Sequence, residues 1–171
     1  MRLWPFLLLA LLLGPAAEAD ARRGESGLPL PRYASLASAR VNMRTGPGKE
    51  FPVRWVYVRK GLPVKIVDEA DVWRKVVDPD GETGWMHSAL LSSRRSVMVR
   101  DAIQELKRRP ARDAITIARV EPGVVAWLDT CRGAWCLVEV EDMRGWLPRD
   151  HLWGIEPDRR SQRNERGRSA A

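Results

Sequence analysis

The sequence is poor in the residue types from which catalytic and metal sites are usually built. Its 171 residues include only two His and two Cys. His87 and His151 occupy different positions in the internal repeat described below, and no known nucleophile or metal-binding motif is present. Two acidic groups lack the ligand spacing of a calcium loop, and we interpret them as solvated turns: Asp68, Glu69 and Asp71, and Asp78, Asp80 and Glu82. We therefore expect no catalytic residue, no metal site and no cofactor.

Long hydrophobic runs are also missing. The apolar segment Leu3–Leu13 has 11 residues, whereas a membrane-spanning helix takes about 20. Arg2 before this segment and the small residues up to Ala19 after it are typical of a secretory signal peptide. We expect residues 1–19 to be a signal peptide that is cleaved after Ala19, or alternatively after Ala21. The mature protein is then periplasmic or secreted, with no transmembrane segment.

The two Cys lie close together in the sequence. Cys131 and Cys136 enclose a short segment that contains Gly133, which can make a tight turn between two strands. Their spacing differs from that of the CxxC redox motif, and a metal site would need further ligands. Because an exported protein reaches an oxidising compartment, we expect Cys131 and Cys136 to form a structural disulfide.

Phe and Tyr are scarce, with two of each, whereas Trp occurs eight times. An internal repeat accounts for half of these Trp residues. In each copy a turn Gly is followed by a first Trp and then by a Gly-Trp-apolar triplet: Gly61, Trp73 and Gly84-Trp85-Met86, then Gly123, Trp135 and Gly145-Trp146-Leu147. We expect Trp85 and Trp146 to be core aromatic residues, because a small barrel needs large apolar side chains. For Trp73 and Trp135, a core position and a surface groove are both open.

Three further Trp residues, Trp55, Trp127 and Trp153, have no counterpart in the other copy. They pack between the copies or mark a binding surface. A basic run that includes Arg94, Arg95 and Arg100 lies at the junction of the copies. We interpret this run as a solvated face, with a site for an anionic polymer as the alternative. The net charge of +7 permits acidic partners but does not identify one.

Each copy is about 55 to 60 residues long and consists of short apolar runs separated by turn signals such as Asp80-Gly81. This pattern predicts an all-β fold with two small barrels in tandem. The segment Ala102–Arg109 is ambiguous between helix and strand, and we favour a distorted strand. The expected domains are a flexible linker over residues 20–33, a first barrel over 34–93, a second over 94–156 and a disordered basic tail over 157–171.

Four segments of the first copy together resemble the bacterial SH3-like (SH3b) domain. They are Asn42-Met43-Arg44-Thr45-Gly46-Pro47-Gly48, Lys60-Gly61, Trp73 and Gly81-Glu82-Thr83-Gly84-Trp85-Met86. The family signature runs N-x-R-x-G-P-G, a turn K-G, a mid-domain W and a closing G-x-x-G-W-V. The second copy looks like a divergent member, because it keeps Gly123, Trp135 and Gly145-Trp146-Leu147 but lacks the early glycines.

The resemblance implies two SH3-like β-barrels that act as a non-catalytic binding module. In similar exported proteins such modules are associated with cell-wall peptidoglycan or its peptides, so we expect that partner here. The alternative is an envelope protein–protein interaction scaffold that does not bind the wall. Export disfavours nucleic acid as a partner. We expect the ligand-binding residues to include Arg44, Trp73 and Trp135, with the groove beside the loops over residues 44–54 and 68–73.

Overall fold

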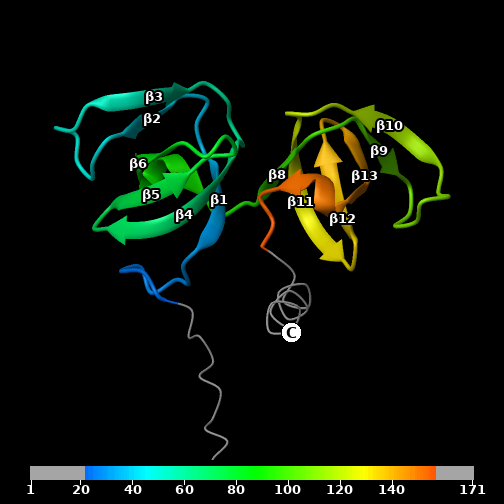
Figure 1. Ribbon diagram of the computed structural model, residues 1–171, viewed down its shortest axis with the longest axis horizontal. Helices are drawn as coiled ribbons and strands as arrows, with labels where there is room; N and C mark the ends of the chain where they lie inside the picture. The colour runs from blue at the N-terminus through cyan, green and yellow to red at the C-terminus, as the bar shows by residue number, and fades with distance from the viewer. Residues whose placement is uncertain (1–21, 157–171) are drawn as a thin grey trace, which may run out of the picture.

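The computed structural model describes residues 22–156, which form two small β-barrels side by side (Figure 1). The described chain is almost entirely strand and turn, in two seven-stranded sheets with the same strand order. The predicted all-β fold with two tandem barrels is therefore confirmed. The expected signal peptide and basic tail lie outside the described residues. Over residues 22–156, no helix is long and apolar enough to cross a membrane.

The first sheet has the strand order β3-β2-β6-β5-β4-β1-β7, and the paired strands are antiparallel. Its strands are β1 (Arg32–Leu36), β2 (Val41–Arg44), β3 (Val53–Tyr57), β4 (Pro63–Ala70), β5 (Trp73–Val77), β6 (Thr83–His87) and β7 (Leu91–Ser92). Side chains alternate across these strands, so that Val41 and Met43 are fully buried whereas Asn42 and Arg44 face outward. A 3₁₀ turn, η1 (Ser88–Leu90), precedes β7.

The second sheet repeats this order as β10-β9-β13-β12-β11-β8-β14. Its strands are β8 (Ser96–Val99), β9 (Gln104–Lys107), β10 (Thr116–Val120), β11 (Val125–Arg132), β12 (Trp135–Val140), β13 (Met143–Pro148) and β14 (Leu152–Trp153). The ambiguous segment Ala102–Arg109 therefore contains a strand, β9, rather than a helix. A second 3₁₀ turn, η2 (Arg149–His151), precedes β14. Each barrel has its own apolar core, built mainly from Val and Leu side chains, with Met43 and Met86 added in the first barrel.

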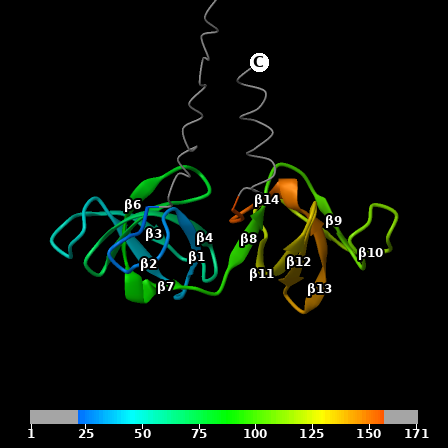
Figure 2. The same cartoon turned by 90° about the horizontal axis from the view of Figure 1, so that it is seen from below.

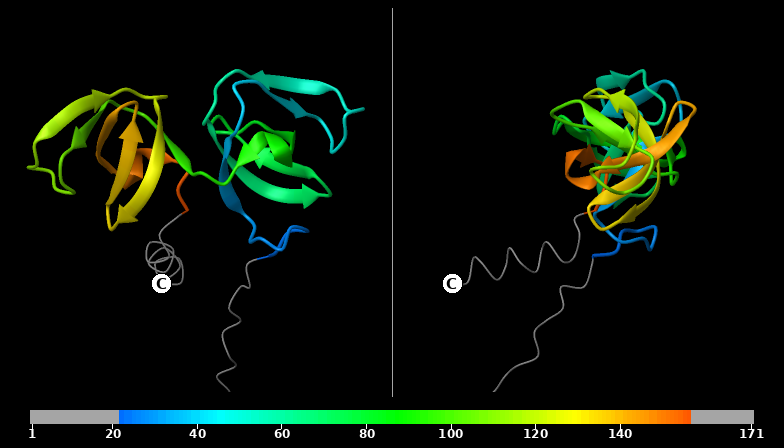
Figure 3. Two further views of the ribbon diagram at one scale, coloured as in Figure 1. Left: turned by 180° about the vertical axis from the view of Figure 1, so that it is seen from behind. Right: turned by 90° about the vertical axis from the view of Figure 1, so that its right-hand side faces the viewer.

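The two barrels meet directly along β1, β8 and the turn before β4 (Figures 2 and 3). Trp153 packs edge to face against Tyr33, with ring centroids 5.2 Å apart. Trp127 lies beneath the guanidinium of Arg94 at 3.9 Å and beside Gly61. Thus two of the three unmatched Trp residues pack between the copies, while the third, Trp55, is 49% exposed on β3.

The segment before β1 differs from the flexible linker that the sequence suggested for residues 20–33. Residues 22–31 fold back on the first barrel, where Leu30 is 5% exposed and joins its core. The backbone N–H and the hydroxyl of Ser26 both donate hydrogen bonds to Glu69, at 2.7 and 2.9 Å. The linker prediction is wrong for residues 22–31, because Ser26 binds the buried Glu69 carboxylate and Leu30 packs into the core of the first barrel.

Candidate binding pocket

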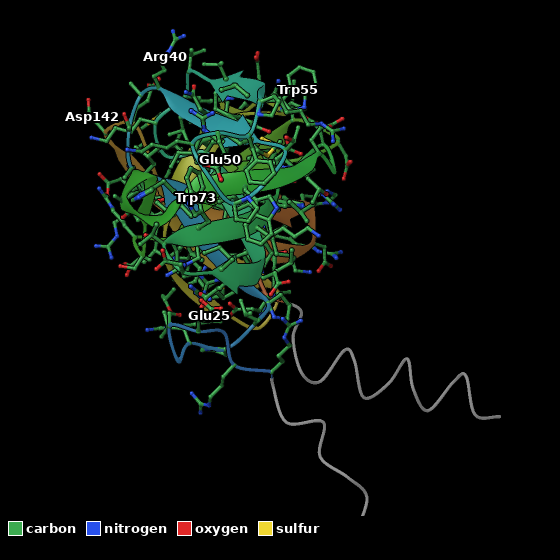
Figure 4. The ribbon with its side chains drawn as sticks, turned by 90° about the vertical axis from the view of Figure 1, so that its left-hand side faces the viewer. Glu25, Arg40, Glu50, Trp55, Trp73 and Asp142 are labelled. Atoms are coloured by element: carbon green, nitrogen blue, oxygen red, sulfur yellow. A yellow bond between two sulfur atoms is a disulfide. The ribbon has the colours of Figure 1, made fainter. Side chains whose placement is uncertain are left out.

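A cavity of about 330 Å³ opens on the first barrel between β2, β5 and η1. It is lined by Asn42, Arg44, Lys49, Trp73, His87, Ala89 and Leu90. The structure thus brings together Arg44 and Trp73, which lie 29 positions apart in the sequence and were both predicted to bind ligand. Figure 4 looks onto this barrel, with Trp73 near the middle of the view and Trp55 toward its upper rim.

Arg44 holds the loop that forms one wall of this cavity. Its Nη1 donates hydrogen bonds to the carbonyl oxygens of Lys49 and Phe51, at 3.0 and 2.7 Å. The loop also needs Gly46, because a Cβ at that position would lie 2.3 Å from the Phe51 ring. The G-P-G part of the motif therefore shapes the wall, and the hydrogen bonds of Arg44 hold the loop in place.

Trp73 and His87 form the aromatic part of the cavity. They are cross-strand partners on β5 and β6, and their rings meet edge to face at 5.4 Å. His87 Nδ1 accepts a hydrogen bond from the backbone N–H of Ala89, at 3.2 Å. Because Nδ1 is an acceptor, the neutral imidazole carries its proton on Nε2, where it can donate.

The cavity therefore combines a half-buried aromatic surface with the cations Arg44 and Lys49 and the amide of Asn42. Such a surface can stack on an apolar or sugar-like face of a ligand while the charged rim contacts carboxylate or carbonyl oxygens. Among the described residues, no group of three or more His, Cys, Asp or Glu could hold a metal ion.

The second barrel carries different chemistry at the equivalent positions. Trp135 pairs with Pro148, whereas Trp73 pairs with His87. Lys107 takes the place of Arg44, since each pairs with the Trp of the Gly-Trp motif. Lys107 Nζ binds Glu105 at 2.6 Å, and this hydrogen bond lowers the pKa of the Glu105 carboxyl. The structure therefore does not bring Trp135 into a copy of the first cavity's chemistry.

The two Trp residues that were expected to fill the cores behave differently. Trp85 is only half-buried and lies on the outer face of β6, while Gly84 and Met86 face the core. The core prediction is therefore wrong for Trp85. A Cβ at Gly84 would lie 2.5 Å from the Met43 side chain, so the Gly must face inward and its Trp neighbour outward.

Trp146 is 9% exposed, which makes it a buried residue. It too stands on the strand face opposite its neighbours Gly145 and Leu147, and Leu147 joins the apolar cluster of the second barrel. The guanidinium of Arg132 lies 5.9 Å from the Trp146 ring centroid. The prediction of a buried core position is thus confirmed for Trp146, although Trp146 is not one of the residues of this cluster.

The predicted disulfide is confirmed. Cys131 and Cys136 face each other across the β11–β12 hairpin, and their sulfur atoms are bonded at 2.04 Å. Gly133 makes the turn between the strands with a φ of 55°, in the left-handed region that favours glycine. The disulfide closes a hairpin on the second barrel, and its Cα atoms are 4.0 Å apart.

Two carboxylates that were interpreted as parts of solvated turns are in fact buried. Glu69, on β4, binds Arg32 Nη2 at 2.5 Å and Arg74 Nε at 3.3 Å. Burial alone would raise the pKa of Glu69, but hydrogen bonds from Ser26 and Arg32 outweigh it and lower the pKa to about 2. The solvated-turn interpretation is wrong here because charged partners replace the water.

Asp78 is the second buried carboxylate, 4% exposed in the β5–β6 turn. Its Oδ1 accepts hydrogen bonds from the backbone N–H groups of Asp80 and Glu82, at 3.0 and 2.8 Å. Its Oδ2 accepts a hydrogen bond from the Tyr57 hydroxyl at 2.8 Å. Burial and this hydrogen bond raise the pKa of Tyr57 far above its usual range. Asp78 therefore organises the turn and anchors β3 to it.

Comparison with solved structures finds low sequence identity. NlpC2 from Trichomonas vaginalis is 13% identical with a TM-score of 0.35, over 75% of this chain and 50% of that one. NlpC1 from the same organism is 12% identical with a TM-score of 0.35, over 80% and 51%. An NlpC/P60 family protein from Bacillus cereus is 15% identical with a TM-score of 0.33, over 71% and 55%. This chain therefore spans about half the length of these proteins.

Comparison with curated protein sequences gives no significant match. The family model of the bacterial SH3 domain, however, matches twice, over residues 37–93 and 101–154. These two matches cover well over half of the chain and coincide with the two barrels. The resemblance read from the Gly-Trp repeat is thereby confirmed, and the chain belongs to the bacterial SH3 domain family.

Proposed function

We propose that this protein is a non-catalytic binding module of the bacterial cell envelope that recognises peptidoglycan or its peptides. Domains of the bacterial SH3 family typically bind rather than catalyse, and two of them make up the described chain. The disulfide between Cys131 and Cys136 supports a location outside the cytoplasm, periplasmic or secreted. The domain limits that we propose are 34–93 and 94–156, with the segment before β1 packed on the first barrel.

The observation that carries the proposal is the cavity shared by Arg44 and Trp73. Wall peptides offer backbone amides and free carboxylates, and wall glycans offer flat sugar faces. In our proposal Trp73 contacts the apolar or sugar face, while Arg44 and Lys49 attract the carboxylates. Because these cations lie on an open rim, salt should weaken binding without abolishing it.

A retention assay on purified peptidoglycan sacculi tests this function. The mature protein should sediment with the sacculi at both low and moderate salt. A variant with Arg44→Gln and Lys49→Gln should be retained much less, because both cations at the cavity rim are removed. Arg40→Gln, an exposed change outside the cavity, is the matched control and should be retained like the parent protein. Absence of retention of the parent protein at both salt concentrations would overturn the proposal.

One observation favours a second candidate function, an envelope scaffold that binds proteins and not the wall. The edge strand β3 and its flanks expose several large apolar side chains: Phe51, Val53, Trp55, Val56 and Val58, between 37% and 74% exposed. An exposed apolar edge strand is a common docking surface for another protein. Crosslinking in intact envelopes would distinguish the two functions, since a scaffold should be recovered with a protein partner that Trp55→Ala releases.

A further inference from the structure

A second cavity, of about 290 Å³, lies between β1, β4, β5 and the junction of the barrels. Three arginines line it: Arg32 from β1, Arg74 from β5 and Arg95 from the segment before β8. It shares no lining residue with the pocket of Arg44 and Trp73.

Two of these guanidinium groups have a nitrogen without an acceptor. In the described part of the chain, Nη1 of Arg32 and Nε of Arg95 are buried and make no hydrogen bond. Arg32 uses its Nη2 for Glu69, and Arg95 uses its other nitrogens for Glu156 and the carbonyl oxygen of Gly154. Buried donors of charged groups are normally satisfied, so unpaired ones beside a cavity indicate a missing acceptor.

The charges around the cavity favour an anion of a single charge. The three arginines face two carboxylates, Glu69 and Glu156, so that one positive charge remains in excess. Glu69 stays ionised because its pKa is lowered to about 2 by its hydrogen bonds, despite its burial. One excess positive charge matches a carboxylate better than a phosphate, which carries nearly two charges at neutral pH.

The remaining walls of the cavity are apolar or hydroxylic. Its lining residues include the apolar Ile66 and Leu91, and Tyr33, whose side chain carries a hydroxyl group. Burial raises the pKa of Tyr33, so that its hydroxyl remains a donor at neutral pH. A ligand that carries a hydrogen-bond acceptor on a short apolar group would therefore fit both the polar and the apolar parts of the wall.

We propose that this junction cavity is a binding site for a carboxylate carried on a short apolar group, such as the C-terminal carboxylate of a peptide. The carboxylate oxygens accept hydrogen bonds from Arg32 and Arg95, while the apolar stem lies against Ile66 and Leu91. Because Arg95 belongs to the segment that joins the barrels, and Tyr33 packs on Trp153 of the second barrel, an occupied site links both barrels. This site does not depend on the wall-binding function proposed above.

Calorimetric titration of the full chain with three probes tests the proposal. N-acetylalanine supplies the carboxylate, N-acetylalaninamide is its neutral counterpart, and inorganic phosphate is the alternative oxyanion. We expect N-acetylalanine to bind at least about tenfold more tightly than the amide, the ratio expected from one lost charge-assisted hydrogen bond. Equal binding of acid and amide, tighter binding of phosphate, or no binding of any probe would overturn the proposal.

Two variants locate the site. Arg95→Gln should weaken N-acetylalanine binding by about tenfold or more, since it removes both the charge and the unpaired Nε. Arg32→Lys keeps the charge that Glu69 needs but lacks the second nitrogen, so it should weaken binding while the protein stays folded. Arg109→Gln, an exposed change outside the cavity, is the matched control. If Arg95→Gln and Arg32→Lys bind the probe like the control, the site is not this cavity. This conclusion holds whether or not the protein is retained on peptidoglycan sacculi.

Discussion

Ser96 Oγ donates a hydrogen bond of 2.5 Å to the carbonyl oxygen of Gly61, and this bond joins the two barrels. Ser96 is 1% exposed, so water cannot replace the bond. Gly61 has a φ of 82°, and a Cβ there would lie 3.2 Å from the Trp127 ring of the second barrel. The turn Gly of the family motif therefore serves both the first barrel and its contact with the second.

The first prediction concerns this bond. Ser96→Ala should lower the free energy of unfolding by about 1–3 kcal/mol, because it leaves a buried carbonyl oxygen without its donor. Chemical denaturation of the full chain, followed by Trp fluorescence, measures the change. Ser38→Ala removes only an exposed 3.4 Å hydrogen bond from the backbone N–H of Arg40, so it should stay within about 0.5 kcal/mol of the parent protein. A Ser96→Ala variant as stable as the Ser38→Ala control would show that the junction bond contributes nothing.

The second prediction concerns pH. The pKa of Glu69 falls from an ordinary value of 4.5 to about 2 in the folded protein, through hydrogen bonds from Ser26 and Arg32 that outweigh its burial. A carboxyl whose folded pKa is lowered stabilises the fold above its unfolded pKa and loses that contribution as the pH falls. Stability from Glu69 should thus be complete above about pH 5 and be lost towards pH 2, by about 3 kcal/mol in all.

Glu69→Gln is the variant that isolates this effect. Its free energy of unfolding should lie well below that of the parent protein at pH 7, and the two should converge towards pH 2. Denaturation curves at a series of pH values measure the difference, with exposed Glu50→Gln as the control. A constant difference between Glu69→Gln and the parent protein across this range would mean that the Glu69 carboxylate is not responsible.

The sequence predicted those features that depend on residues close together along the chain. The Gly-Trp repeat, the turns at Asp80-Gly81 and Gly133, and the disulfide all follow from short spacings, because a hairpin brings near neighbours together. The placement of Arg44 and Trp73 in one cavity was predictable for a different reason: they lie 29 positions apart, but both belong to the family motif.

Other features depend on strand parity and distant partners, which local patterns do not reveal. A β-bulge between Ile66 and Asp68 shifts the alternation of β4, so that Glu69 rather than Asp68 is buried. The partners of Glu69, Arg32 and Ser26, lie far upstream, and both belong to the segment over residues 20–33 that was predicted to be a linker. Trp85 faces outward because Gly84 must face Met43. This contact between two strands exists only in the packed sheet, so the local sequence does not reveal it.

The third prediction concerns the disulfide. Protein produced in an oxidising compartment should lack two hydrogen atoms by mass analysis, because Cys131 and Cys136 are bonded. A thiol-alkylating reagent should label neither residue until a reductant is added. Changing both residues to Ser should lower the free energy of unfolding by roughly 2 kcal/mol in the chain-entropy description of so short a loop. Alkylation of both thiols without reductant would contradict this prediction.

The fourth prediction concerns the inequality of the two barrels. Trp73→Ala should weaken binding of soluble peptidoglycan fragments by about tenfold, the loss expected when one aromatic contact is removed. Trp135→Ala should leave the affinity nearly unchanged, because Trp135 stands against Pro148, and Lys107, the counterpart of Arg44, is held by Glu105. Fluorescence or calorimetric titration of both variants against one fragment preparation makes the comparison direct.

Trp73→Phe separates the loss of the ligand contact from a loss of folding. It keeps an aromatic ring beside His87 and should therefore bind with an affinity between those of the parent protein and Trp73→Ala. Equal losses in Trp73→Ala and Trp135→Ala would mean that both barrels bind in the same way. That result would contradict a site that depends on Arg44 and His87, since the second barrel has Lys107 and Pro148 at the equivalent positions.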